Sequence, residues 1–128
     1  MSFHDPHLLA RAGGRLYAVP GTRILRIARY EEGGEARIDL SRVLGEEGAA
    51  VSAETSVVVV EAGPEASIGL VVDEAVGIVT FGADELLPPP DFGPGVAAPY
   101  IAALGKHEDA FAIVLDLDRL LDGREGDA

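Results

Sequence analysis

The first chemically suggestive cluster in this chain is His4-Asp5-Pro6-His7, which has the character of a metal-binding segment. Imidazole and carboxylate groups hold metals when a rigid framework and outer hydrogen-bond partners orient them. A chain terminus seldom supplies that framework. We therefore expect a solvated start with no metal and no other cofactor. His107 stands beside Glu108 and Asp109 in a polar turn, where we expect an exposed rather than a catalytic side chain.

Adjacent carboxylates are the second pattern, and they occur at Glu31-Glu32, Glu46-Glu47, Asp73-Glu74 and Asp84-Glu85. Paired acids perform acid–base catalysis when their environments separate their pKa values. Neighbouring residues of a strand point to opposite faces, so such pairs cannot share a substrate there. We expect solvated surface acids. Asp73 is the exception, because a carboxylate at the end of a strand can accept hydrogen bonds from turn amides.

The glycine and serine motifs also argue against an enzyme. Gly93-Pro94-Gly95-Val96-Ala97-Ala98 fits a dinucleotide fingerprint only loosely, since it follows a proline run and Pro94 has no amide proton. Ser67 lacks the preceding glycine of a nucleophile elbow, because Glu65 stands in its place. We expect no enzymatic activity. A small-molecule or metal-binding enzyme is kept as the alternative from another class.

The elements that would position these residues read as an all-β chain, because apolar runs are short and turn signals frequent. Gly13-Gly14 between Leu8–Ala12 and Arg15–Val19 predicts a hairpin. Thr22–Tyr30 is ambiguous, since its arginines recur at helical spacing while its isoleucines suit a bent strand. Further strands are predicted at 35–39, 56–61, 67–72, 75–81, 100–104 and 111–115, with a proline-rich ordered loop at 86–94.

The sequence also contains two weak internal matches. Leu16–Pro20 aligns with Ile68–Val72 at an offset of 52, and two predicted short helices, Ile38–Leu44 and Leu115–Leu121, match at an offset of 77. Their shared order indicates two related β-subdomains, at about 8–50 and 55–122, within one domain spanning 1–123. A loose tail is expected at 124–128. The difference of 25 between the offsets indicates that the first half lacks about 25 residues before its closing helix.

The composition limits the possible partners. The net charge is −12, and residues 65–128 carry three basic and thirteen acidic side chains, which excludes nucleic acid as the partner. No apolar run approaches eighteen residues, and the start lacks the basic and apolar regions of a signal peptide. Cysteine is absent, which excludes disulfides and thiolate metal sites. We expect a cytoplasmic protein with no membrane partner.

The order of these features resembles the CheW-like domain, which is found in chemotaxis coupling proteins and at the end of chemotaxis histidine kinases. The most specific stretch is Ser67–Asp73 followed by Val76, and Leu86–Pro90 looks like the proline-bearing loop of the family. Ile113–Asp116 followed by Leu120-Leu121 looks like its last strand and closing helix. The resemblance implies two SH3-like, five-stranded β-barrels, of which the first would be incomplete here.

The resemblance further implies a non-enzymatic scaffold or adaptor in chemotaxis-type signal transduction. It would link a histidine kinase regulatory domain with a chemoreceptor tip or with another CheW-like protein. The residues nearest the partner-contact strand of the family are Arg23, Ile24, Leu25 and Arg26, and Ile24 matches its apolar contact. The alternative for Ile24 and Ile27 is that both are core residues.

Two departures from the family pattern keep a second function open. The Asn-Leu-Arg-Gly signature of the family and its flanking strand are missing between Tyr30 and Ile38, and Arg26 stands where the family tends to have an acid. We expect a partner strand or a second copy of the chain to fill the resulting gap. The alternative function is therefore a divergent self-association or interaction module in another assembly, for example as a homodimer.

Overall fold

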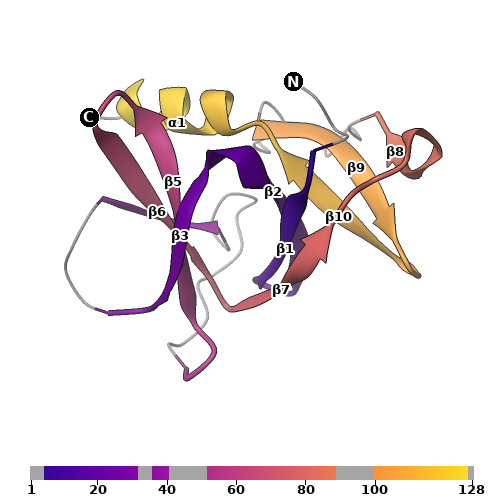
Figure 1. Ribbon diagram of the computed structural model, residues 1–128, viewed down its shortest axis with the longest axis horizontal. Helices are drawn as coiled ribbons and strands as arrows, with labels where there is room; N and C mark the ends of the chain where they lie inside the picture. Colours follow the sequence, from indigo (N-terminus) through magenta and orange to yellow (C-terminus); the bar gives the residue numbers. More distant parts are fainter. Residues whose placement is uncertain (1–4, 32–35, 41–51, 89–99, 127–128) are drawn as a thin grey trace.

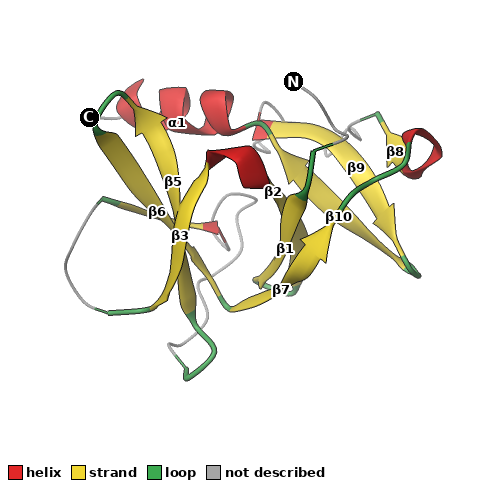
Figure 2. Cartoon of the chain, in the orientation of Figure 1, coloured by secondary structure: helices red, strands yellow, loops and turns green. Residues whose placement is uncertain are grey.

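The computed structural model describes residues 5–31, 36–40, 52–88 and 100–126 of the chain, which form two β-sheets and one helix. Figures 1 and 2 show the two sheets side by side, with the helix α1 (Leu117–Gly126) lying above the smaller sheet and following directly from β10 of the larger one. The predicted all-β architecture is confirmed.

Strand pairing places most of the chain in a six-stranded sheet. Its spatial order is β7 (Glu74–Val79), β1 (His7–Ala12), β2 (Arg15–Pro20), β10 (Ala110–Leu115), β9 (Ile101–His107) and β8 (Leu86–Leu87). The second sheet has the order β3 (Ile24–Arg29), β5 (Ser56–Gly63), β6 (Ala66–Val72) and β4 (Arg37–Asp39). Two short 3₁₀ turns, η1 (Gly21–Arg23) and η3 (Ala83–Glu85), precede β3 and β8.

The internal repeat is present in the order of the strands. The antiparallel pair β1–β2 is extended by β10, which is parallel to β2, and the antiparallel pair β5–β6 is extended by β4, which is parallel to β6. The third strand of each unit crosses to the opposite sheet. β3 follows β2 along the chain but pairs with β5, whereas β7 follows β6 but pairs with β1. The two units are therefore interlocked by an exchange of strands.

Because of this exchange, each sheet combines strands from both halves of the sequence. The sheets do not follow the sequential halves 8–50 and 55–122, because β1 and β2 belong to the same sheet as the last strands of the chain. The two units still differ in size as expected. In the larger sheet β9 and β8 lie beyond β10, whereas β4 is the last strand of the smaller sheet within the described residues.

One hydrophobic core joins the two sheets. It is formed by Leu8, Ala10, Ala12, Tyr17, Val19, Leu40, Val58, Val60, Leu70, Val72, Ile101, Ile113, Leu115, Leu117 and Leu120. A second cluster packs on the other face of the larger sheet around Leu9, Phe81 and Val114. The four valines 57–60 are all at most 2% exposed, which confirms that β5 is buried on both faces. The Tyr17 hydroxyl donates a hydrogen bond to the Leu40 carbonyl oxygen at 3.2 Å inside this core.

The closing helix α1 begins two residues later than predicted, because β10 continues through Leu115. Asp116 caps its first turn, since its carboxylate accepts the amide proton of Arg119 at 3.2 Å. The helix continues to Gly126 through Gly123, where the sequence led us to expect a loose tail. A single glycine lowers helix propensity without ending a helix.

The earlier predicted helix is not confirmed at its start. Ile38 and Asp39 belong to β4, where they pair with Leu70 and Val71 of β6. A parallel strand partner satisfies their backbone groups and overrides the local helical pattern. The rest of the predicted helix, residues 41–44, lies outside the described residues, as does most of the proline-rich loop at 86–94.

Candidate partner-binding surface

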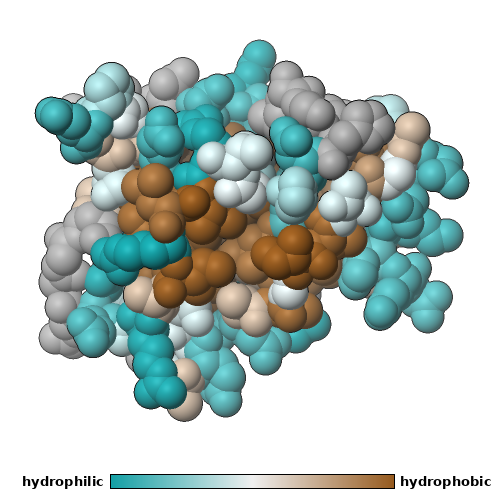
Figure 3. Space-filling view, viewed as in Figure 1, coloured by the Kyte–Doolittle hydropathy of each residue, from teal (hydrophilic) through white to brown (hydrophobic). Residues whose placement is uncertain are grey.

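Four large apolar side chains are exposed on the two exchanged strands. They are Leu25 (57% exposed) and Ile27 (46%) on β3, and Val76 (45%) and Ile78 (67%) on β7. We name this set the β3–β7 face. Figure 3 shows apolar side chains gathered over β3 and over the β1–β7 pair on one side of the molecule. Exposed apolar patches on a folded domain mark interaction sites when they are contiguous.

A shallow groove connects the two halves of this face. It has a volume of about 400 Å³ and is lined by Pro6, Gly21, Thr22, Ile24, Ile27 and Ile78. Gly21 is required at its edge, because a Cβ atom there would lie 2.7 Å from the Pro6 carbonyl oxygen, which accepts the Gly21 amide proton at 2.9 Å. The groove thus joins two strands that are more than forty positions apart in the sequence.

Both strands of the face are edge strands with a bulge. β3 pairs only with β5, and β7 pairs only with β1, among the described residues. The register of β3 shifts between Ile24 and Arg26, so that Leu25 is the extra residue of the first bulge. On β7, Val76 is the extra residue of the second bulge, opposite Leu9 and Ala10 of β1. Bulges redirect side chains and interrupt an edge that could otherwise pair indiscriminately. At both bulges the redirected side chain is apolar and exposed.

The structure places the four predicted contact residues in different environments. Leu25 and Arg26 are exposed on β3. Ile24 is half-buried, packs against the main core and also lines the groove. Its position therefore has features of both a core residue and a surface residue. Ile27 lines the groove as well and is more exposed than a core residue would be. The ambiguous segment begins in η1 and continues as the bulged strand β3, as its isoleucines indicated.

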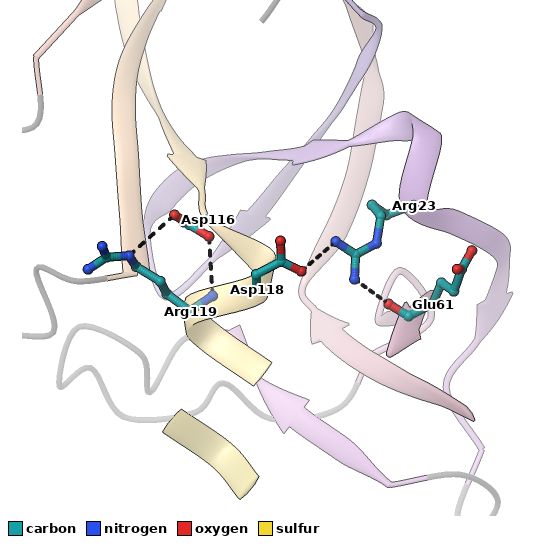
Figure 4. A network of polar contacts seen from close by, with 5 residues as sticks. All are labelled: Arg23, Glu61, Asp116, Asp118 and Arg119. Atoms are coloured by element: carbon teal, nitrogen blue, oxygen red, sulfur yellow. Dashed lines mark hydrogen bonds and ion pairs between the residues drawn. The ribbon is translucent and has the colours of Figure 1, made fainter. Parts of the chain in front are cut away.

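Arg23, the fourth predicted contact residue, instead bonds within the chain. Its Nη1 donates to Asp118 Oδ1 and its Nη2 donates to the Glu61 carbonyl oxygen, both at 2.8 Å (Figure 4). The side chain of Arg23 is 28% exposed and that of Asp118 is 74% exposed. The guanidinium group therefore connects η1, β5 and α1 at the edge of the groove.

His7 corrects the expectation of a solvated start. The residue is completely buried in β1, its Nδ1 lies 2.8 Å from the Asp5 carbonyl oxygen, and its ring is 5.6 Å from that of Phe81. Its Nε2 is buried without a hydrogen-bond partner. Burial lowers the pKa of His7 below its usual 6.5, because the charged imidazolium would lose its hydration. β-sheet pairing with β2 and β7 holds it in this position.

The paired acids serve structural roles where the structure describes their contacts. Asp73 behaves as predicted, since its Oδ2 accepts the Gly13 amide proton at 3.0 Å. Glu74 forms a 3.0 Å ion pair with Arg11, and Glu85 accepts the Gly82 amide proton at 2.7 Å. In the described part of the chain, no three histidine, aspartate or glutamate side chains gather in a way that could hold a metal ion. None of the described helices is long and apolar enough to cross a membrane.

Val76 and Ile78 were not anticipated as surface residues from the sequence. An apolar strand between Ala75 and Phe81 reads as core, and only the pairing of β7 at a sheet edge exposes one of its faces. In the sequence, the signal for a bulge in this strand is Gly77, a glycine inside an apolar run.

Comparison with known families decides where the chain belongs. A model of the CheW-like domain matches residues 36–125. The chain belongs to the CheW-like domain family. It is similar to the chemotaxis protein CheW of Klebsiella aerogenes, with 28% identity over 88 residues, which make up 69% of this chain and 52% of that protein. The chain thus aligns with only about half the length of this curated CheW.

The fold is similar to that of the scaffolding protein TtCheW from Thermoanaerobacter tengcongensis. The TM-score is 0.75 at 15% identity, and the match covers 91% of this chain and 87% of TtCheW. This similarity confirms the predicted architecture of two SH3-like β-barrel subdomains.

Proposed function

We propose that this CheW-like domain is a non-enzymatic scaffold or adaptor of chemotaxis-type signal transduction. It would link the regulatory domain of a histidine kinase with a chemoreceptor tip or with another CheW-like protein, in the cytoplasm. The observation that carries the proposal is the exposure of Leu25, Ile27, Val76 and Ile78 on two edge strands of a CheW-like fold.

The physical chemistry of the β3–β7 face supports binding to protein. Its apolar side chains flank a groove of about 400 Å³, and removing such side chains from water supplies a favourable free energy of association. Arg26 and Arg29 are exposed on β3, in a chain of net charge −12. A partner that combines apolar side chains with carboxylates would match this surface and not the acidic remainder of the molecule.

One observation favours the second function, self-association. The smaller sheet ends at β4 in the described part of the chain, whereas the equivalent strand β10 is covered by β9. A strand from another copy could pair with β4 at the position that β9 occupies in the larger sheet. A concentration-dependent mass in sedimentation equilibrium would support this function, and a constant monomer mass would exclude it.

The adaptor function is tested by titrating the purified chain with the kinase regulatory domain and, separately, with a receptor-tip fragment from the same organism. We expect saturable binding to at least one of them in isothermal titration calorimetry, and weaker binding by the Leu25→Asp variant. Asp109→Lys, an exposed change in the β9–β10 turn, is the matched control. Absence of binding to both fragments would contradict the proposal.

A further inference from the structure

Arg23 joins three elements that are distant in the sequence. Its two terminal nitrogens reach Asp118 on α1 and the carbonyl oxygen of Glu61 on β5, 95 and 38 positions away (Figure 4). A planar guanidinium group holds two acceptors in a fixed relative geometry. These contacts lie at the end of η1, immediately before β3 begins.

The α1 side of this link is firmly anchored. Leu117, Leu120 and Leu121 are each at most 4% exposed, and Asp116 caps the first turn through the amide of Arg119. The Leu120 amide donates to the Asp116 carbonyl oxygen at 3.0 Å. Asp118 therefore projects from a helical turn that packing and capping hold in place.

The β3 side depends on the link. Ile24 pairs with Val60, and the pairing then skips Leu25 before it resumes between Arg26 and Val59. Ahead of the bulge, this one ladder pair and the packing of Ile24 against the main core hold the beginning of β3. The Ile24 amide donates to the Gly21 carbonyl oxygen, which ties the beginning of β3 to η1 and not to α1. The contacts of Arg23 attach this segment directly to β5 and α1 through a side chain.

We infer that Arg23 is a positioning residue, which fixes the start of β3 against α1 and thereby orients Leu25 on the β3–β7 face. The inference rests on the proposed function, because it assigns to Arg23 an indirect role in the binding of a kinase regulatory domain. The predicted partner contact at Arg23 is replaced by this intramolecular role. Since the Asp118 side chain is largely exposed, added salt weakens the link.

The first experiment needs no partner. Amide hydrogen exchange is measured at Ile24 in the wild type, Arg23→Ala, Arg23→Lys and Asp118→Ala. We expect exchange to be about 2- to 5-fold faster in Arg23→Ala, partly restored in Arg23→Lys, and faster to a smaller extent in Asp118→Ala. Lys106→Ala removes an exposed positive charge on β9 of the larger sheet, so it is the matched control and should leave Ile24 unchanged. An unchanged Ile24 amide in Arg23→Ala would overturn the inference.

The second experiment separates positioning from contact. Affinity for the kinase regulatory domain is measured in the same variants and in the double variant Arg23→Ala/Asp118→Ala. We expect both single variants to bind more weakly, and the double variant to bind no more weakly than Arg23→Ala alone. Full affinity in Asp118→Ala, beside a loss in Arg23→Ala, would show that Arg23 touches the partner and would overturn the inference. If the wild type binds no regulatory domain, the proposed function fails, while the exchange result still decides the role of Arg23.

Discussion

The carboxylate of Asp73 accepts a hydrogen bond from the Gly13 amide at 3.0 Å, and the Asp73 amide in turn donates to the Arg11 carbonyl oxygen at 2.8 Å. These two bonds tie the passage from β6 to β7 to the β1–β2 hairpin, at the point where one repeat unit sends its third strand into the other sheet. Asp73 thus secures the exchange of strands.

We predict that Asp73→Ala lowers the free energy of unfolding by about 1 to 3 kcal/mol, because it leaves the partly buried Gly13 amide without its charged acceptor. Urea unfolding followed by circular dichroism measures the change. Asp109→Ala, in the exposed β9–β10 turn, is the control and should change stability by less than about 0.5 kcal/mol. Equal stability of the two variants would show that the Asp73 bond contributes nothing.

A second prediction concerns Gly105 of β9. A Cβ atom at this position would lie 2.5 Å from the Phe81 ring, which is fully buried. Gly105→Ala should therefore destabilise the chain by about 1 to 3 kcal/mol through overpacking. Gly77→Ala on β7 is the control, since its Cβ would meet no atom within 4 Å. Thermal unfolding of both variants compares them, and an unaffected Gly105→Ala would mean that Phe81 can move aside freely.

The buried His7 predicts a pH dependence of stability. Because burial lowers its pKa in the folded chain below 6.5, the unfolded chain binds the proton more readily. The contribution of His7 to stability is thus fully present above pH 6.5 and is lost as the pH falls below it. We expect the free energy of unfolding to fall less steeply from pH 7.5 to 5.5 in His7→Gln than in the wild type.

Thr80→Ala is the control for this comparison, because Thr80 is exposed and its side chain does not titrate in this range. Its pH profile should follow that of the wild type. An identical pH slope in His7→Gln and the wild type would contradict the assigned role of the buried imidazole.

A fourth prediction separates contact residues from core residues on β3. Leu25→Asp should weaken binding of the kinase regulatory domain while leaving the unfolding free energy within about 0.5 kcal/mol of the wild type, because Leu25 is mostly exposed. Ile24→Asp should lower that free energy by more than about 1 kcal/mol, since Ile24 packs against the main core. Binding and urea unfolding are measured on the same samples. Undiminished binding by Leu25→Asp would remove β3 from the contact surface.

Local patterns in the sequence predicted much of the fold. The Gly13-Gly14 hairpin and the fully buried valines of β5 follow from short-range physical chemistry. The acceptor role of Asp73 at a strand end was also predicted, although its partner Gly13 lies 60 positions away. The offset of 52 between Leu16–Pro20 and Ile68–Val72 corresponds to the equivalent strands β2 and β6. These features depend on turn geometry and alternation, which a single sequence carries.

The remaining features depend on contacts between distant segments. No local pattern shows that β3 and β7 exchange sheets, so the sequence could not place Ile27 and Ile78 on one groove. The same holds for Arg23, whose partner Asp118 lies 95 positions away. His7 was misjudged because nearness to the terminus suggested exposure, whereas pairing with both β2 and β7 buries it.

The adaptor proposal is tested most directly by whether the chain brings two partners together. The kinase regulatory domain is mixed with membranes that contain the chemoreceptor of the same organism and is sedimented with and without the chain. We expect the regulatory domain to sediment with the membranes in the presence of the wild-type chain, and less so with Leu25→Asp. Sedimentation that is unchanged by the wild-type chain would contradict it.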